Sequence, residues 1–316
     1  MLGNKGEDAV NPVGTGRAGS NGSGTQLARA SISDLLRRTQ ASVLFGAHDA
    51  LGAKIAEECG ADGLWISSFE VHAAHGLPDA DILGTEDYVH VIAQIVDRVG
   101  IPVLVDGNAG GGNAINTIRL VREFEKAGAL GMCIEDNPFP KRCSFYDGMQ
   151  DHLEDADTFC GKLQAAVEKR LNPEFAVIGR VEALNKGLGI DVALERAKRY
   201  AAVGVEAILI HHKGKDATPV LRFADAWFET ETTPLVCVPT TYNHVTYNEL
   251  NDAGFKLIIF ANYGIRSVVS ALRSTFGAIM VNKRLADADG QVASMQDIFD
   301  LVYVDELKDN EARYLR

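Results

Sequence analysis

Acidic, amide and basic side chains directly follow several short apolar runs along the chain. Asp106 and Asn108 follow the run VLV, and Glu135 follows GMCI. Arg180 follows AVIG. Carboxylate and amide oxygens suit Mg²⁺, which binds one or two carboxylates together with water and substrate, and a guanidinium suits a carboxylate or phosphate-type anion. These residues predict a site that holds a divalent cation and an anionic substrate.

Each of these residues also has a structural interpretation that the sequence leaves open. The acidic and amide groups could cap helices or solvate loops, and Arg180 could simply pair with Glu182. His211 and His212 both follow another apolar run. We expect one of the two to point into the site and the other to pack outside it, and a histidine in such a position is as often a packing residue as a catalyst.

The segment EDNPFPKRCSFYDG (135–148) has two prolines, a Lys-Arg pair, a thiol and no clear periodicity. It predicts a loop that closes over the site. Lys141 and Arg142 bring positive charge next to Cys143, which predicts a lowered thiol pKa; an ordinary exposed thiol is the alternative. The remaining cysteines lie in apolar stretches and are predicted to be core residues: Cys59, Cys133, Cys160 and Cys237.

The elements that position these side chains alternate along the chain. Short runs rich in Val, Ile and Leu are typical of parallel strands buried on both faces, and amphipathic stretches lie between them, several ending at a glycine that suits a helix C-cap. Eight such units predict an α/β fold, a (β/α)8 TIM-type barrel, with a doubly wound sheet as the alternative. Because barrel active sites lie where strands end, polar residues after nearly every run favour an enzyme. The predicted strands are residues 42–45, 63–66, 103–105, 131–134, 176–179, 207–210, 235–238 and 257–260, and the clearest helices are 114–127, 158–170 and 192–202.

Composition excludes some classes of protein. The 316 residues include 31 Lys and Arg against 43 Asp and Glu, a formal net charge of −12. This disfavours binding to nucleic acid or to an anionic membrane, so an anionic substrate needs a local cationic pocket or a metal ion. Five scattered cysteines without a CxxC pair indicate reduced thiols. With no long apolar run and no signal-peptide core, we expect a cytoplasmic protein.

Three regions are predicted along the chain. Residues 1–26 are rich in Gly, Ser and Asn and are predicted to be a disordered tail. Residues 27–285 form the barrel, and residues 286–316 form a C-terminal helical arm with helices at 294–304 and 306–314.

Several motifs together resemble the phosphoenolpyruvate mutase/isocitrate lyase superfamily over nearly all of the chain from about residue 40. They include VDGNAGGGNAIN (105–116), EDNPFPKRCS (135–144), GRVEAL (179–184) and VPTTY (238–242). The resemblance implies a Mg²⁺-dependent enzyme that acts on a small anionic 2-oxo acid. It assigns substrate binding to Trp65, Ser67, Ser68, Phe69 and Arg180, metal binding to Asp106, Asn108 and Glu135, and catalytic roles to Asp79, Lys141, Cys143, Ser144 and His211.

Two departures from the superfamily pattern keep the reaction open. Mutases and hydrolases of the superfamily usually read DxDTG after the third strand, whereas Asn108 and Ala109 stand here in place of the second acid and the Thr. The mutase loop reads EDKxxxxxNS, but this chain has Asn137 and Cys143 in place of its Lys and Asn. The Lys-Arg-Cys sequence matches the lyases, in which the Cys is a general acid.

The favoured hypothesis is phosphorus–carbon bond chemistry on phosphonopyruvate or phosphoenolpyruvate. One alternative is carbon–carbon cleavage or decarboxylation of a 2-oxo or 2-hydroxy diacid that uses Cys143, and another is a barrel without chemistry that binds an anion or a partner. The resemblance also implies a helix-swapped homotetramer in which the last helix packs on a neighbouring barrel, with a dimer as the alternative.

Overall fold

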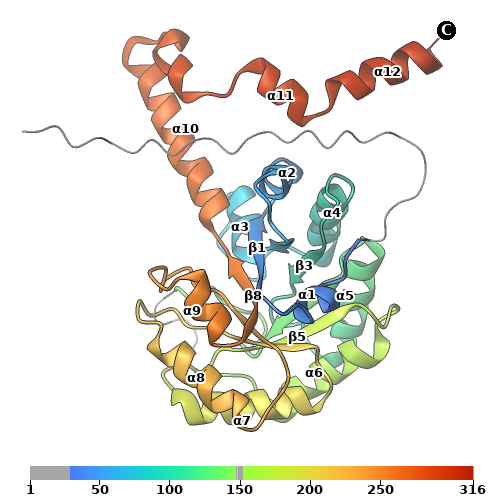
Figure 1. The fold of residues 1–316 in the computed structure, drawn as a ribbon, viewed down its shortest axis with the longest axis vertical. Coiled ribbons are helices and arrows are strands. Elements are labelled where there is room, and N and C mark those ends of the chain that lie inside the picture. Colours follow the sequence, from blue (N-terminus) through green and yellow to red (C-terminus); the bar gives the residue numbers. More distant parts are fainter. Residues whose placement is uncertain (1–28, 147, 149–151, 316) are drawn as a thin grey trace, which may run out of the picture.

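Eight parallel strands close into a barrel in the computed structural model, which describes residues 29–146, 148 and 152–315. The strands pair in chain order and β8 pairs with β1, while helices cover the outside (Figure 1). The predicted barrel is confirmed and the doubly wound alternative is wrong. The predicted disordered tail, residues 1–26, lies outside the described residues. The strands are β1 (Ser42–Ala47), β2 (Gly63–Ile66), β3 (Val103–Asp106), β4 (Gly131–Glu135), β5 (Ala176–Val181), β6 (Ala207–Ile210), β7 (Leu235–Cys237) and β8 (Phe255–Phe260).

Some strands run further than the sequence predicted, and the difference matters for the site. Asp106 ends β3 and Glu135 ends β4, while Arg180 lies within β5, although all three were expected to follow their strands. In the barrel Asp106 is paired with Cys133, and Glu135 with Arg180. The strand ladder therefore fixes the backbone of these three residues, so their side chains start from rigid positions.

The helices follow the strands, and left-handed glycines end several of them. The predicted C-cap glycines 60, 128, 204 and 254 have φ between 88° and 95°, a conformation that favours glycine. The helices are α1 (Ile32–Leu36), α2 (Ala50–Glu58), α3 (Ser68–Ala74), α4 (Thr85–Val96), α5 (Ala114–Lys126), α6 (Ala156–Lys169), α7 (Gly189–Ala202), α8 (Thr218–Phe228), α9 (Tyr247–Asp252), α10 (Tyr263–Asn282), the 3₁₀ helix η1 (Leu285–Gln291), α11 (Met295–Leu301) and α12 (Val304–Tyr314).

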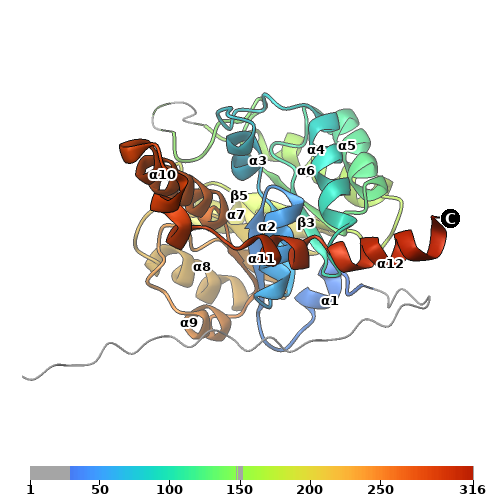
Figure 2. The same ribbon diagram turned by 90° about the horizontal axis from the view of Figure 1, so that it is seen from above.

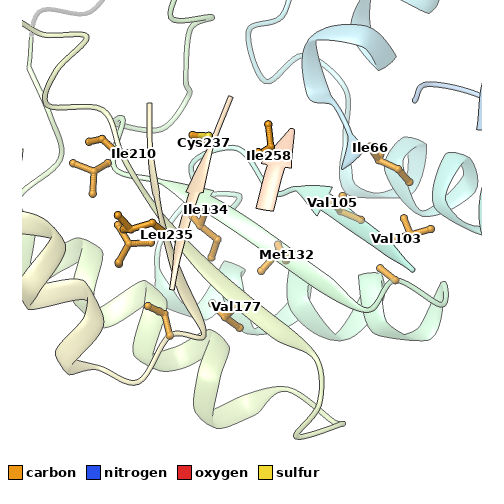
Figure 3. Packing of buried hydrophobic residues seen from close by; sticks show 14 of the residues in the cluster. Ile66, Val103, Val105, Met132, Ile134, Val177, Ile210, Leu235, Cys237 and Ile258 are labelled. Carbon is orange, nitrogen blue, oxygen red and sulfur yellow. The ribbon is translucent and has the colours of Figure 1, made fainter. Parts of the chain in front are cut away.

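The strands contribute apolar side chains to two separate layers. Leu64 and Ile66 of β2 point outward to the helices, and Trp65 between them points into the barrel. Alternation of this kind is the consequence of the two-residue period of a strand. Figure 3 shows the outer layer, where residues such as Ile134 and Val177 from neighbouring strands gather against the helices. The short helix α1 belongs to the inner layer through Ile32, Leu35 and Leu36.

The last four helices form an extension that leaves the barrel along α10 and returns over α2. Of α10 only Ile265 is buried, and the helix rises from β8 well beyond the barrel (Figures 1 and 2). Helices α11 and α12 run back across the side that carries α2, where Lys54 lies 3.4 Å from the centre of the Tyr303 ring. The arm predicted from residue 286 is thus continuous with an exposed helix, while the boundary at 285 stays a prediction. Across the described residues, we find no helix with the length and hydropathy needed to cross a membrane.

The prediction that four cysteines belong to the core is only partly right. Cys133 and Cys237 are buried and Cys160 is half-buried, but Cys59 is exposed. Cys59 is the C-cap residue of α2 and lies at the end of that helix.

We predict that replacing Leu35 by Ala lowers the free energy of unfolding by about 2 to 5 kcal/mol. Leu35 is fully buried in the inner layer, so the smaller side chain leaves a cavity. Urea denaturation measures the change, with Leu171→Ala at an exposed position as the matched control. Equal loss in both variants would contradict the packing described for α1.

Candidate functional site

The predicted site residues gather around one small cavity, of about 50 Å³, at the carboxyl ends of the strands. A water molecule needs about 10 to 15 Å³ of such space, so the cavity suits a small ligand. Eleven of the thirteen predicted residues line it: Trp65, Ser67, Ser68, Phe69, Asp79, Asp106, Lys141, Cys143, Ser144, Arg180 and His211. Asn108 instead lines a neighbouring cavity of about 200 Å³, and Glu135 is buried beside Arg180.

Lys141 brings a buried ammonium group into the middle of the site. Its Nζ donates hydrogen bonds to Ser68 Oγ at 2.8 Å and to Asp79 Oδ2 at 3.1 Å. Burial opposes a charge at this position, but Asp79, Glu135 and Asp106 together raise the pKa of Lys141 well above its ordinary value. Lys141 is therefore a permanent cation among carboxylates.

Asp106 is held as an anion at the end of β3. Its Oδ2 accepts a hydrogen bond of 2.8 Å from Ser68 Oγ, and its Oδ1 accepts one of 3.2 Å from the N–H of Asn108. Burial would raise the pKa of Asp106, yet Lys141 and Arg180 lower it below its ordinary value. The backbone N–H of Ser68, expected to bind substrate, also points at Asp106 Oδ2, at 3.4 Å.

Three buried side-chain oxygens near this cluster accept no hydrogen bond: Asp79 Oδ1, Asn108 Oδ1 and Glu135 Oε2. Glu135 Oε2 has only the ion pair with Arg180 Nη2, at 3.2 Å. Since buried oxygens normally have a donor, these atoms have capacity for a ligand. Within residues 29–146, 148 and 152–315 no three His, Cys, Asp or Glu side chains form a metal cluster by themselves. The unpartnered carboxylate and amide oxygens are ligand types that suit a hydrated Mg²⁺, which needs only one or two carboxylates.

Glu182 organises the opposite side of the cavity. Its Oε1 accepts a hydrogen bond of 2.6 Å from Arg180 Nε and lies 2.7 Å from His211 Nδ1. Its Oε2 accepts from Ser144 Oγ at 2.9 Å and from Asn185 Nδ2 at 2.8 Å. Burial favours a protonated carboxyl, but Arg180 and His211 hold the pKa of Glu182 well below its ordinary value. A charged Glu182 thus orients both the Arg180 guanidinium and the His211 ring.

Sequence reasoning treated Glu182 only as a structural partner of Arg180. Its position two residues after Arg180 was the available signal, because side chains two apart at a strand end lie on the same face. The pair of histidines behaves as predicted: His211 lines the cavity, whereas His212 packs near the ring of Tyr242, with 6.3 Å between the ring centres. No motif in the sequence indicated Asn185 as a site residue, because its hydrogen bond to Glu182 depends on the folded loop.

The segment predicted to close over the site, residues 135–148, overlaps the β4–α6 loop, residues 136–155, of which 147 and 149–151 lie outside the described part. Its residues 141 and 143–145 line the cavity, and its closure stays a prediction. Two of its backbone N–H groups are held by the segment before α4. Lys141 N–H donates to Asp81 Oδ2 at 2.6 Å, and Cys143 N–H donates to the carbonyl oxygen of Asp79 at 3.1 Å. These bonds fix the loop in the register that brings Lys141, Cys143 and Ser144 to the cavity.

The predicted lowering of the Cys143 pKa is wrong. Cys143 is buried, and burial together with Asp79 raises its pKa to about 11, although the hydrogen bond from the Phe145 backbone and the Lys141 charge act in the opposite direction. Loss of water around the thiol therefore has a larger effect on the pKa of Cys143 than the positive charge of nearby Lys141. A protonated thiol suits a proton donor and not a nucleophile.

Comparison with known proteins gives one consistent result. Residues 32–280 match the family model described as phosphoenolpyruvate phosphomutase. A phosphoenolpyruvate phosphomutase of Tetrahymena pyriformis is 34% identical over 90% of this chain and 94% of its own length. A phosphonopyruvate hydrolase of Variovorax sp. (strain Pal2) is 36% identical over 85% of this chain and 93% of its own length.

Solved structures agree with this result. A phosphoenolpyruvate phosphomutase from Streptomyces platensis subsp. rosaceus superposes with a TM-score of 0.87 at 40% identity, covering 89% of this chain and 97% of its own. A phosphonopyruvate hydrolase solved in complex with oxalate and Mg²⁺ superposes with a TM-score of 0.84 at 34% identity. The superposition covers 90% of this chain and 98% of the hydrolase chain.

We predict that iodoacetamide modifies Cys59 at least about tenfold faster than Cys143 at pH 7.5, because only the thiolate reacts and Cys143 is both buried and raised in pKa to about 11. The rate at Cys143 should rise about tenfold per pH unit from pH 7 to 10, below its pKa. Peptide mass spectrometry measures both rates, and urea-unfolded protein is the control in which the difference disappears. Equal rates in the folded protein would contradict the burial of Cys143.

Proposed function

The chain belongs to the phosphoenolpyruvate phosphomutase family, and from this premise we propose that it is a Mg²⁺-dependent enzyme acting on the phosphorus–carbon bond of a small 2-oxo acid such as phosphonopyruvate. The family match covers most of the barrel, in agreement with the resemblance found in the motifs. The family is one of enzymes, so the hypothesis of a barrel without chemistry receives no support.

The charge distribution of the cavity carries the proposal. Arg180, His211 and Lys141 all line a space that suits a few non-hydrogen atoms, and Asp106 lines the same space. A 2-oxo acid with a second anionic group offers negative charge to the cationic residues and oxygens to a cation held by Asp106. The size and polarity of the cavity together favour a compact, multiply charged anion.

Residues Asp106 and Glu135, with Asn108 and Asp79 beside them, would hold Mg²⁺. The ion would stabilise negative charge that develops on the 2-oxo oxygen as the bond breaks. A phosphonopyruvate hydrolase relative was solved with Mg²⁺ and oxalate, which supports this assignment.

The protein side chains have separate roles around the reacting group. Arg180, oriented by Glu182, binds the anionic phosphorus group by a charged hydrogen bond. His211 Nδ1 is engaged by Glu182, so Nε2 is the ring nitrogen left for the substrate. Lys141 adds positive charge from the covering loop, and that loop excludes water from a reactive phosphoryl group.

Carbon–carbon cleavage is the second candidate, and Cys143 is the observation that favours it. The thiol lines the cavity and its pKa of about 11 keeps it protonated, as a general acid requires. Phosphorus–carbon chemistry stays ahead because the mutase and hydrolase relatives match most of the chain at 34% and 36% identity.

A phosphorus NMR time course with phosphonopyruvate and Mg²⁺ tests the proposal. We expect the phosphonate signal to decay, with phosphoenolpyruvate appearing in a mutase and inorganic phosphate with pyruvate appearing in a hydrolase. Asp106→Asn should slow the reaction by ~10²-fold or more, because it removes the anion at the cation site.

Cys143→Ala separates the two candidates. Phosphonopyruvate turnover should persist in this variant, whereas a lyase that uses the thiol as its acid loses ~10²-fold or more. No phosphonate turnover by the wild type, together with cleavage of a methylisocitrate-like acid that Cys143→Ala abolishes, would reverse the order of the two candidates.

We propose that the protein assembles as a homotetramer through its C-terminal helices. Large apolar side chains of α10 and of the arm are exposed in the single chain: Val268, Leu272, Phe276, Met280, Val281, Met295 and Val302 among them. Exposed apolar surface on this scale is typical of an interface. Light scattering should give a mass near four chains of 34.0 kDa. Phe276→Asp should lower that mass, and a wild-type mass of one chain would contradict the proposal.

We also propose a cytoplasmic location. Cys59, Cys133, Cys143, Cys160 and Cys237 are all free thiols in the structure, which supports a reducing compartment.

A further inference from the structure

A fully buried lysine with no part in the proposed chemistry lies behind the site. Lys162 is on α6, and its Nζ donates a hydrogen bond of 3.0 Å to the carbonyl oxygen of Ala109. The same nitrogen lies 2.8 Å from Glu154 Oε2. Burying an ion pair costs as much as it returns, and an apolar side chain of similar size usually stabilises a protein equally well. Stability alone therefore gives no reason for a charge at this position.

The hydrogen bond to Ala109 holds the turn that follows β3. Asn108 and Gly110 have φ of 51° and 81°, so the turn is not part of a regular element. Three successive carbonyl oxygens in it each have a donor from elsewhere. The pairs are Glu135 N–H to Asn108 O at 2.9 Å, Lys162 Nζ to Ala109 O at 3.0 Å, and Thr117 Oγ1 to Gly110 O at 2.9 Å.

Glu154, the second partner of Lys162, is fixed where the β4–α6 loop returns to the barrel. Its N–H donates to the carbonyl oxygen of Asp136 at 2.9 Å, which joins the two ends of the loop. Arg196 donates to the carbonyl oxygen of Glu154 at 3.0 Å and to Asp136 Oδ2 at 3.1 Å. Lys162 thus contacts both the base of the covering loop and the turn that carries Asn108.

We propose that Lys162 is a positioning residue that ties the Asn108 turn to the base of the β4–α6 loop and thereby sets the oxygen donors of Asp106 and Asn108 for the cation. Asn108 N–H donates to Asp106 Oδ1, so a shift of the turn moves the hydrogen-bond environment of Asp106 as well. The cation half of this inference rests on the proposed function, and the ordering of the turn does not.

Two variants separate positioning from stability. Lys162→Met removes the ammonium group. The carbonyl oxygen of Ala109 then has no hydrogen bond from this position, and the carboxylate of Glu154 loses its ion-pair partner. The double variant Lys162→Met/Glu154→Gln also removes the unpaired carboxylate, but the carbonyl oxygen of Ala109 still lacks the hydrogen bond from residue 162. Calorimetry with Mg²⁺ measures cation affinity, hydrogen–deuterium exchange of peptides covering residues 107–117 measures order in the turn, and thermal unfolding measures Tm.

In Lys162→Met we expect Mg²⁺ affinity to fall about tenfold or more, as for other residues that support metal ligands, with faster exchange in the turn and a lower Tm. In the double variant Tm should recover in part, whereas affinity and exchange should stay as in Lys162→Met. Lys54→Met is the matched control: Lys54 is a buried lysine on α2, against Tyr303, and its loss should change neither affinity nor exchange.

Recovery of Mg²⁺ affinity together with Tm in the double variant would show that Lys162 is structural only, and would overturn the inference. If the single variant does not fold, the double variant is compared with the wild type directly. If the wild type binds no Mg²⁺, the proposed function fails, and exchange decides the positioning role. Faster exchange at 107–117 in the double variant then supports that role, and unchanged exchange refutes it.

Discussion

The balance of buried charge at the barrel mouth is the constraint on which the rest of the site depends. Four carboxylates, Asp79, Asp106, Glu135 and Glu182, are buried against two permanent cations, Lys141 and Arg180. The buried carboxylates outnumber these two cations, at a place where unpaired charge is costly. Part of the imbalance shows in Glu135, whose pKa burial raises above its ordinary value. The proposed Mg²⁺ would add positive charge among these carboxylates, which is a physical argument for the proposal that does not depend on relatives.

The barrel makes this density of charge possible because its strands fix the backbone beneath it. Asp106, Glu135 and Arg180 come from three neighbouring strands whose ladder sets their spacing. This part of the site could be predicted, since apolar runs mark the strands and the next polar residue marks the active face. Lys141 could be placed only roughly, because it arrives on a loop whose register depends on Asp81 and Asp79, about sixty residues earlier in the chain.

Three features were missed in the sequence, for one physical reason. The raised pKa of Cys143, the central place of Glu182 and the burial of Lys162 each depend on which groups surround a side chain in space. Neighbours in sequence suggested a lowered thiol pKa, but desolvation by segments far along the chain prevails over one adjacent cation. Asn108 illustrates the same limit, because nothing in its residue type indicated that it would line a second cavity.

The charge balance also explains why a small polyanion suits the cavity better than a neutral molecule. With the proposed Mg²⁺ bound, the carboxylates that pair with Lys141 and Arg180 would also serve the cation. A substrate that brings its own negative charges restores partners to both cations and shares oxygens with the metal. Mono-anions would leave one of these groups unsatisfied in a site of about 50 Å³ that has little room for water. Under the proposed function, electrostatics therefore favours a compact acid with two anionic ends.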